Sequence, residues 1–137
     1  SMRLEKSWGA WTMDFRPDFT IMESGLDFFV DWDKDFIGKK AALIEKKNGP
    51  NKKLSVIQID TETDVSGDEA VMHNEECVSY ITSGGYGHSV KKSLAMTYLP
   101  VELIDSNAQL EVEILGQFCK ASIVMEPLYD PSGSKMR

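Results

Sequence analysis

Short apolar runs separated by turn residues fill the chain after Lys53. Between Leu110 and Ile114, apolar residues alternate with polar ones, which is the pattern of a strand with one buried face. Gly116 and Gln117 follow and predict a hairpin into the next apolar run. The predicted strands cover residues 54–60, 69–73, 77–82, 93–100, 109–115 and 118–125. Short strands without interleaved helices predict a small barrel or sandwich.

The part of the chain before Lys53 has a different pattern. Residues 3–11 predict a short helix that Gly9 weakens, and residues 12–25 predict a loop. The aromatic-rich run 26–33 predicts a strand. Asp35 is expected to cap a helix that ends at Asn48 and Gly49. The change of pattern after Gly49 predicts a domain boundary there.

Composition limits the classes of partner. The chain has 137 residues, of which 42% are hydrophobic and 27% charged, as expected for one globular domain or a domain with part of another. The net charge of -7 argues against a nucleic-acid partner, because phosphate binding needs a basic surface. No apolar run approaches the roughly 18 residues of a membrane helix, and no signal peptide leads the chain, so no membrane partner is expected.

Cysteine and histidine usage argues against a metal site. Cys77 and Cys119 both fall in strand-like segments, and we expect two buried thiols in a reducing compartment, although the sequence leaves a disulfide open. His73 and His88 have no partner at ligand spacing, so no metal ligand is predicted.

The glycine-rich segment from Thr82 to Lys92 invites a functional interpretation. Its lysines come too late for a phosphate-binding loop, and it lacks the third glycine of a dinucleotide fingerprint. Ser83 or Ser89 with His88 lacks the strand–elbow–helix context of a nucleophile. We therefore predict no catalytic residue here. Three glycines are expected to permit positive φ in a tight barrel connection: Gly84, Gly85 and Gly87.

The N-terminal residues offer two binding candidates. Arg3 could bind a ligand carboxylate bidentately, and Trp11 could stack on a flat ring. The alternative is a surface arginine and a core tryptophan. Asp14 and Glu23 could be paired carboxylates, but nothing in the sequence fixes their separation.

Several motifs in a fixed order resemble one superfamily. The stretch "RLEKSWGAWTMDFRPDFTIMESGLDFFVDWDKDFIGKKAAL" resembles the closing segment of the folate-binding domain in the glycine-cleavage T-protein superfamily. The stretches "ITSGGYGHSVKKSLAMTYLPVEL" and "EVEILGQFCKASIVMEPLYDP" resemble its C-terminal barrel. The "EK", the "KSLAMTYLPVEL" and the "EPL" are most similar to the dimethylglycine and sarcosine dehydrogenase branch. Ile21 and Ser24 depart from the usual proline and alanine.

The resemblance implies a fold and a domain organisation. It implies a mainly β protein: an α+β remnant of the folate-binding domain at residues 3–50, then a closed Greek-key aminomethyltransferase-type barrel at residues 53–130. The chain would be the last part of a longer polypeptide, and its partners would be the upstream domains of that polypeptide and a small-molecule folate. The expected compartment is the cytoplasm of a bacterium or the mitochondrial matrix of a eukaryote.

The resemblance also implies a chemistry. The parent would use FAD, bound by an N-terminal domain outside this chain, to oxidise an N-methyl amine, and tetrahydrofolate to capture the one-carbon unit. Arg3 would face the folate and Trp11 would form a pocket wall, whereas the chain alone would catalyse nothing and bind folate weakly or not at all. The alternatives are a glycine-cleavage aminomethyltransferase and a non-catalytic regulatory relative.

Overall fold

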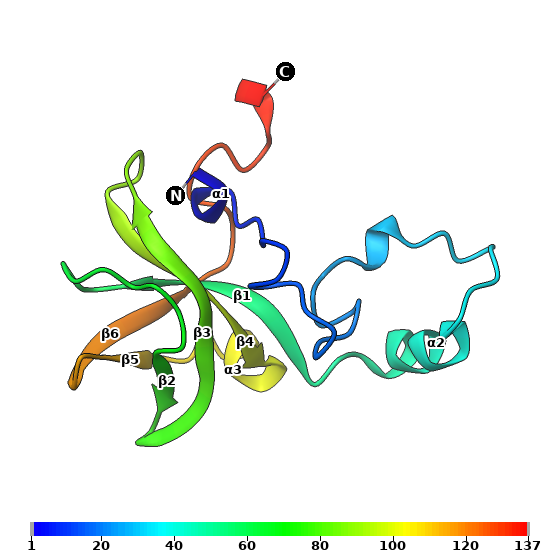
Figure 1. Cartoon of the computed structure of the whole chain (residues 1–137), viewed down its shortest axis with the longest axis horizontal. Coiled ribbons are helices and arrows are strands. Elements are labelled where there is room, and N and C mark those ends of the chain that lie inside the picture. The colour runs from blue at the N-terminus through cyan, green and yellow to red at the C-terminus, as the bar shows by residue number, and fades with distance from the viewer. Residues whose placement is uncertain (1, 137) are drawn as a thin grey trace.

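The protein is built around a closed β-barrel (Figure 1). The computed structural model describes residues 2–136, and within them six antiparallel strands close in the order β1-β4-β3-β2-β5-β6. The strands are β1 (Lys52–Ile59), β2 (Ala70–His73), β3 (Glu76–Gly87), β4 (Lys92–Pro100), β5 (Leu110–Ile114) and β6 (Gln117–Val124). Strands β2, β3 and β4 follow one another in the chain and are neighbours in the sheet. Strand β1 returns to lie beside β4, and these four strands therefore form a Greek key. The predicted barrel is confirmed.

Alternating side chains of the strands fill the barrel. Leu110, Val112 and Ile114 of β5 point inward, as their pattern predicts, and meet Ala121 and Ile123 of β6 in one buried cluster. The short helix α3 (Val101–Asp105) packs its apolar residues against the same cluster. The barrel interior is therefore filled by side chains and forms a packed core rather than a ligand cavity.

Strand β4 is buried on both faces. Leu94 and Met96 form a second cluster with Val56 of β1 and Leu4 of helix α1 (Met2–Glu5), while Ala95 belongs to the barrel interior. Successive strand residues point to opposite faces, so a continuous buried run requires a second covering layer. The N-terminal segment, residues 2–25, supplies that layer.

Helix α1 is shorter than predicted. Beyond Glu5 the backbone turns, with Ser7 in the left-handed region at φ 57°. The amides of Ser7 and Trp8 donate to the carbonyls of Leu4 and Arg3 at 3.0 and 2.8 Å. This pair of bonds is a Schellman motif, which ends a helix.

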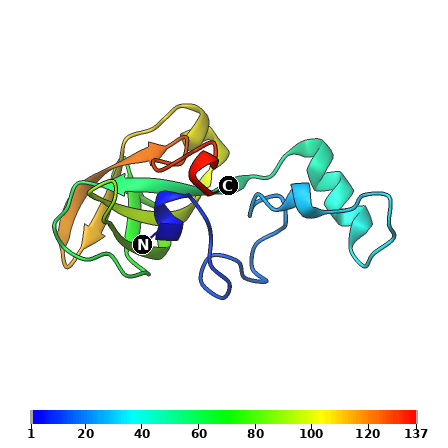
Figure 2. The same cartoon turned by 90° about the horizontal axis from the view of Figure 1, so that it is seen from above.

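Residues 26–48, which we call the arm, project to one side of the barrel (Figure 2). The predicted strand at 26–33 is wrong: residues Asp27–Phe29 form a 3-10 turn, η1, and Phe28 and Phe29 are each 74% exposed. An aromatic run becomes a strand only where a partner strand can receive its hydrogen bonds, and among the described residues none does so.

The arm ends in helix α2 (Lys39–Asn48), which begins later than predicted. Gly38, at φ 87°, occupies the N-cap position that the sequence assigned to Asp35. The predicted end is confirmed, because Gly49 at φ 81° stops the helix. No residue of α2 is buried.

No helix of the described part of the chain is both long and apolar enough to cross a bilayer.

The expected burial of both thiols is wrong for Cys77. Cys77 lies at the start of β3 beside the β2–β3 turn and is exposed, while Cys119 on β6 is partly buried. Both are free cysteines. The sequence pattern placed both cysteines in strands, but it could not show that Cys77 lies at the solvent-exposed end of β3.

Gly84 of β3 serves close packing rather than an unusual dihedral angle. The expectation of positive φ at Gly84, Gly85 and Gly87 is wrong, since all three continue the strand. A Cβ at Gly84 would lie 2.6 Å from the carbonyl oxygen of Val65, whereas one at Gly85 would meet only Leu4 Cδ1 at 3.4 Å. Only glycine lets the segment before β2 lie this close to β3 at Gly84.

We predict that Gly84→Ala destabilises the barrel and Gly85→Ala does not. The added methyl group at Gly84 meets backbone atoms that cannot rotate away, so the free energy of unfolding should fall by about 1–3 kcal/mol. Gly85→Ala should stay within about 1 kcal/mol of the parent. Urea unfolding of the two variants measures the difference, and equal stabilities would contradict the packing argument.

Candidate functional site

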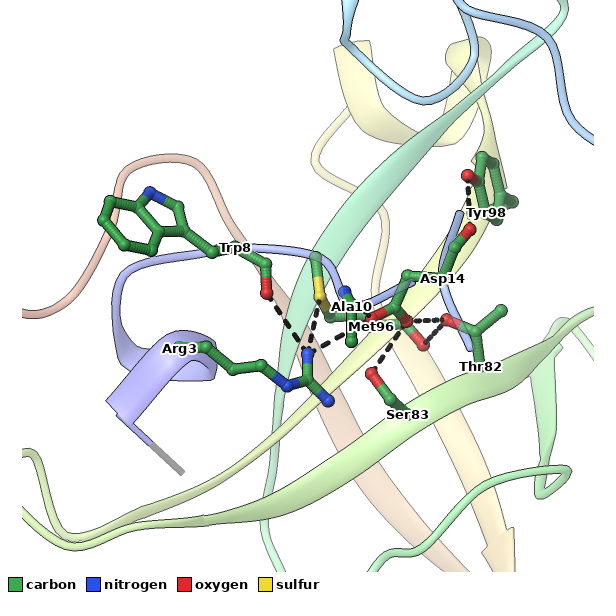
Figure 3. Close-up of polar contacts among 8 residues, drawn as sticks. All are labelled: Arg3, Trp8, Ala10, Asp14, Thr82, Ser83, Met96 and Tyr98. Carbon is green, nitrogen blue, oxygen red and sulfur yellow. Dashed lines mark hydrogen bonds and ion pairs between the residues drawn. The ribbon is translucent and has the colours of Figure 1, made fainter. Parts of the chain in front are cut away.

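A buried carboxylate joins the N-terminal segment to the barrel (Figure 3). The side chain of Asp14 is fully buried, at 0% exposed. Its Oδ2 accepts hydrogen bonds from the Ala10 amide at 2.8 Å and from Arg3 Nη1 at 3.1 Å. Its Oδ1 accepts them from the hydroxyl groups of Thr82 and of Ser83, the latter at 2.7 Å. Both oxygens are therefore satisfied, which a buried charge requires.

A β-bulge makes this arrangement possible. Neighbouring residues of a regular strand point to opposite faces, so Thr82 and Ser83 could not both reach one carboxylate. The pairing of β3 with β4 shifts register between Ile81 and Ser83, which leaves Thr82 as the extra residue. The bulge turns both hydroxyl groups toward Asp14.

Hydrogen bonds hold one nitrogen, Nη1, of the Arg3 guanidinium. Nη1 donates to Asp14 and to the Trp8 carbonyl oxygen at 3.2 Å, and it lies 3.6 Å from the Met96 sulfur. No hydrogen bond of the described residues uses Nε or Nη2, and the side chain remains 30% exposed. Arg3 therefore has a fixed position and a free pair of donors. Such a pair could bind a carboxylate bidentately.

Trp11 lies elsewhere, on an exposed turn. It is 76% exposed and packs edge-on against Phe15 at a ring separation of 5.7 Å. Both line an apolar groove of about 790 Å³ to which Arg16, rather than Arg3, contributes the guanidinium. Arg16 Nη2 donates to Tyr80 Oη at 2.7 Å, and its buried Nε has no partner among the described residues. The structure does not bring Arg3 and Trp11 into one cavity.

Tyr98 extends the polar cluster to β4. Its hydroxyl donates to the Asp14 carbonyl oxygen at 2.8 Å and lies 2.9 Å from Ser24 Oγ, while its ring stacks on Phe19 at 3.5 Å. Burial raises the pKa of Tyr98. The hydrogen bond with Ser24 lowers this pKa, and the negative charge of Asp14 raises it. Tyr98 therefore stays protonated and ties three segments together.

The other carboxylates of the N-terminal segment serve local structure. Glu5 is buried and its Oε1 accepts the amides of Ser89 and Val90 in the β3–β4 turn, at 2.7 and 3.2 Å. Glu23 accepts the Thr20 amide at 2.9 Å and makes no hydrogen bond with Asp14. The open possibility of an Asp14–Glu23 pair is thus wrong. Among the described residues, no group of three or more histidine, cysteine, aspartate or glutamate side chains is placed to hold a metal ion.

The cluster has the chemistry of a binding wall rather than of a reacting centre. Its one carboxylate is fully hydrogen-bonded, its hydroxyl groups donate to that carboxylate, and its free donors belong to Arg3. The sequence could not identify Asp14 as the centre, because its partners Thr82 and Ser83 lie 68 and 69 residues away. The paired hydroxyl residues themselves were the only available signal.

We predict that Asp14→Asn strongly destabilises the fold. The amide removes the charge that pairs with Arg3 and places an NH₂ group against hydroxyl donors, so the free energy of unfolding should fall by about 3 kcal/mol. The matched control is Asp18→Asn, because Asp18 pairs with Arg16 at the surface, where its side chain is 63% exposed. That control should change stability by about 0.5 kcal/mol or less. Denaturant unfolding distinguishes them, and a similar small effect in both variants would contradict the central role of Asp14.

We predict an alkaline loss of stability that depends on Tyr98. A phenol whose pKa is raised on folding stabilises the protein fully below its unfolded pKa, near 10, and loses this contribution as pH rises through the folded pKa. The parent should exceed Tyr98→Phe by about 1–2 kcal/mol at pH 8, and the difference should shrink above pH 10. Urea unfolding across this range measures it. A difference that stays constant to pH 11 would be inconsistent with this assignment.

Known proteins with this architecture share both the barrel and the segment before it. The glycine cleavage T-protein C-terminal barrel domain matches residues 52–130. Human dimethylglycine dehydrogenase, a mitochondrial protein, is 40% identical over 93% of this chain, which covers 15% of that relative. An aminomethyltransferase of Prochlorococcus marinus is 36% identical over 94% of this chain, which covers 35% of it.

A solved structure of an aminomethyltransferase shares the fold of this chain. Aminomethyltransferase T of the glycine cleavage system from Bartonella henselae superposes with a TM-score of 0.85 at 26% identity, over 94% of this chain and 37% of that one. The chain thus spans well under half of the relatives that it matches. It belongs to the glycine cleavage T-protein family, and residues 52–130 are its C-terminal barrel domain.

Proposed function

We propose that this chain is the C-terminal part of a folate-dependent N-methyl amine dehydrogenase acting on dimethylglycine or sarcosine. The observation that carries the proposal is the 40% identity to human dimethylglycine dehydrogenase, which extends over 93% of the chain and therefore includes the N-terminal segment as well as the barrel. In this proposal, the barrel and that segment complete the wall of a tetrahydrofolate site in the whole polypeptide.

Arg3 would provide the contact with the anionic end of the folate. Its Nη1 is occupied by Asp14 and the Trp8 carbonyl, so the guanidinium cannot swing, while Nε and Nη2 remain available. A guanidinium with two free parallel donors fits a carboxylate of the glutamate tail. Tetrahydrofolate would itself accept the one-carbon unit. Trp11 would contribute to the wall of the folate site separately, through the groove that it shares with Phe15 and Arg16 and that Arg3 does not line.

The remaining cofactor and partners belong to the rest of the polypeptide. The chain carries no glycine-rich dinucleotide fingerprint, so FAD would bind to an upstream domain. The upstream domains would be the principal partners of this chain. The compartment would be the mitochondrial matrix in a eukaryote or the cytoplasm in a bacterium, by analogy with the mitochondrial human relative.

A second candidate function is glycine-cleavage aminomethyl transfer. It is favoured by the structural match to aminomethyltransferase T and by the 36% identity to the Prochlorococcus enzyme. The two candidates differ in one chemical step, because only the dehydrogenase reduces a flavin with its substrate.

We predict that the whole polypeptide reduces bound flavin with dimethylglycine or sarcosine and converts tetrahydrofolate to methylenetetrahydrofolate. Arg3→Gln should raise the KM for tetrahydrofolate about tenfold, which corresponds to about 1.4 kcal/mol, and leave the rate of flavin reduction unchanged. Stopped-flow absorbance of the flavin and a product assay measure the two steps separately.

The control for this experiment is Lys120→Gln, which removes an exposed positive charge from β6. It should change neither step. A polypeptide without substrate-dependent flavin reduction would overturn the dehydrogenase assignment. An Arg3→Gln variant with an unchanged KM for tetrahydrofolate would instead remove Arg3 from the folate site.

A further inference from the structure

A second set of polar contacts holds the helix that carries Arg3. Helix α1 has only four residues, and an isolated helix of that length is not stable in water. Its position therefore depends on the segments that contact it. Two of these are the β3–β4 turn and the segment after β6, which returns to α1 near the end of the chain (Figure 1). We call the second one, residues 125–136, the C-terminal strap.

Glu5 ties α1 to the barrel through the β3–β4 turn. Its buried Oε1 accepts the amides of Ser89 and Val90. Gly87 makes this approach possible, because a Cβ at that position would lie 3.0 Å from Glu5 Cγ and 3.1 Å from Glu5 Oε1. The turn thus holds the last residue of the helix from the barrel side.

The C-terminal strap holds the same end of the helix. The Tyr129 amide donates to the Glu5 carbonyl oxygen at 3.1 Å, and Lys6 Nζ donates to the Asp130 carbonyl oxygen. Lys6 Nζ also lies 3.4 Å from Asp130 Oδ2, and the two side chains are only 12% and 1% exposed. Water and salt therefore screen this ion pair much less than one at the surface.

Asp130 is itself fixed within the strap. Ser134 Oγ donates to its Oδ1 at 3.1 Å, and the Lys135 amide donates to its carboxylate at 3.3 Å. The Gly133 amide donates to its carbonyl oxygen at 2.9 Å. Both groups that receive Lys6 are thus held in place by the strap, which makes Asp130 a rigid partner for Lys6.

We propose that Lys6 is a positioning residue for Arg3. The inference rests on the proposed function, because it takes Arg3 as the folate contact. The Lys6 amide donates to the Arg3 carbonyl oxygen at 3.2 Å, so the ion pair with Asp130 bears directly on the backbone of Arg3. Asp14 holds Nη1 at the other end of the Arg3 side chain. A side chain held at both ends points its free Nε and Nη2 in one direction, as binding of a carboxylate by two donors requires.

Kinetics of the whole polypeptide test the proposal. Lys6→Met keeps a long side chain but removes the ammonium group, and it should raise the KM for tetrahydrofolate about fivefold without changing the rate of flavin reduction. Lys6→Arg should restore the KM to within about twofold, because a guanidinium can still pair with Asp130. The matched control is Lys135→Met, since the exposed Lys135 binds Asp130 through its amide and not its side chain. It should change neither step.

A double variant separates positioning from an independent effect. A residue that acts only through Arg3 has no effect once Arg3 is replaced. Arg3→Gln combined with Lys6→Met should therefore have the KM of Arg3→Gln alone, to within about twofold. A KM that rises by the product of the two single effects, about fiftyfold, would show that Lys6 acts independently of Arg3 and would overturn the proposal.

Mobility of the Arg3 side chain provides a measurement that requires neither folate nor turnover. In ¹⁵N relaxation of this chain, the order parameter of the Arg3 Nε–H bond should fall by about 0.2 in Lys6→Met and recover in Lys6→Arg. Circular dichroism confirms that each variant is folded. Asp130→Asn, which weakens the same ion pair from the strap, should lower the order parameter in the same direction and replaces Lys6→Met if that variant does not fold.

The two measurements separate the proposal from the proposed function. An unchanged order parameter in Lys6→Met would overturn the positioning role. So would an unchanged KM in Lys6→Met where Arg3→Gln raises it. A lowered order parameter together with an unchanged KM in Arg3→Gln would uphold the positioning of Arg3 by Lys6 and refute only the folate contact.

Discussion

The buried carboxylate of Asp14 is the constraint on which the arrangement of the N-terminal segment depends. A charge that is removed from water must be paired and hydrogen-bonded, and here the partners come from α1, from the Ala10 amide and from β3. The same residue receives Tyr98 of β4 on its carbonyl oxygen. One residue, through its side chain on β3 and its carbonyl oxygen on β4, thus fixes the position of the covering layer on two strands of the barrel.

The burial of β4 follows from this constraint. Apolar contact through Leu4 alone would allow the covering layer to slide, because hydrophobic packing has no direction. The bonds to Asp14 have direction and fix one register. The bulge at Thr82 also helps to fix this register, because a regular β3 would offer the carboxylate only one hydroxyl group.

The sequence predicted the barrel well because each strand has one face in a shared interior. The alternation of Leu110, Val112 and Ile114 depends only on neighbouring residues, and it held. It could not predict which cluster receives Leu94 and Met96, since that depends on a helix about 90 residues earlier. The same limit applies to Asp14, and to Gly84, whose close neighbour is the backbone of Val65. The sequence named Arg3 as a binding candidate from its chemistry, but it could not predict the pairing of Arg3 with Asp14.

The failed strand at residues 26–33 has a different cause. Its residues favour an extended, half-buried conformation, yet their side chains are exposed and their backbone lacks a partner strand. Local preference and observed environment therefore conflict in the arm, while they agree throughout the barrel. Natural sequences usually keep these levels consistent, and the arm departs from that rule. The carboxylate of Asp14 is fully hydrogen-bonded among the described residues, whereas Phe28 and Phe29 of the arm remain exposed.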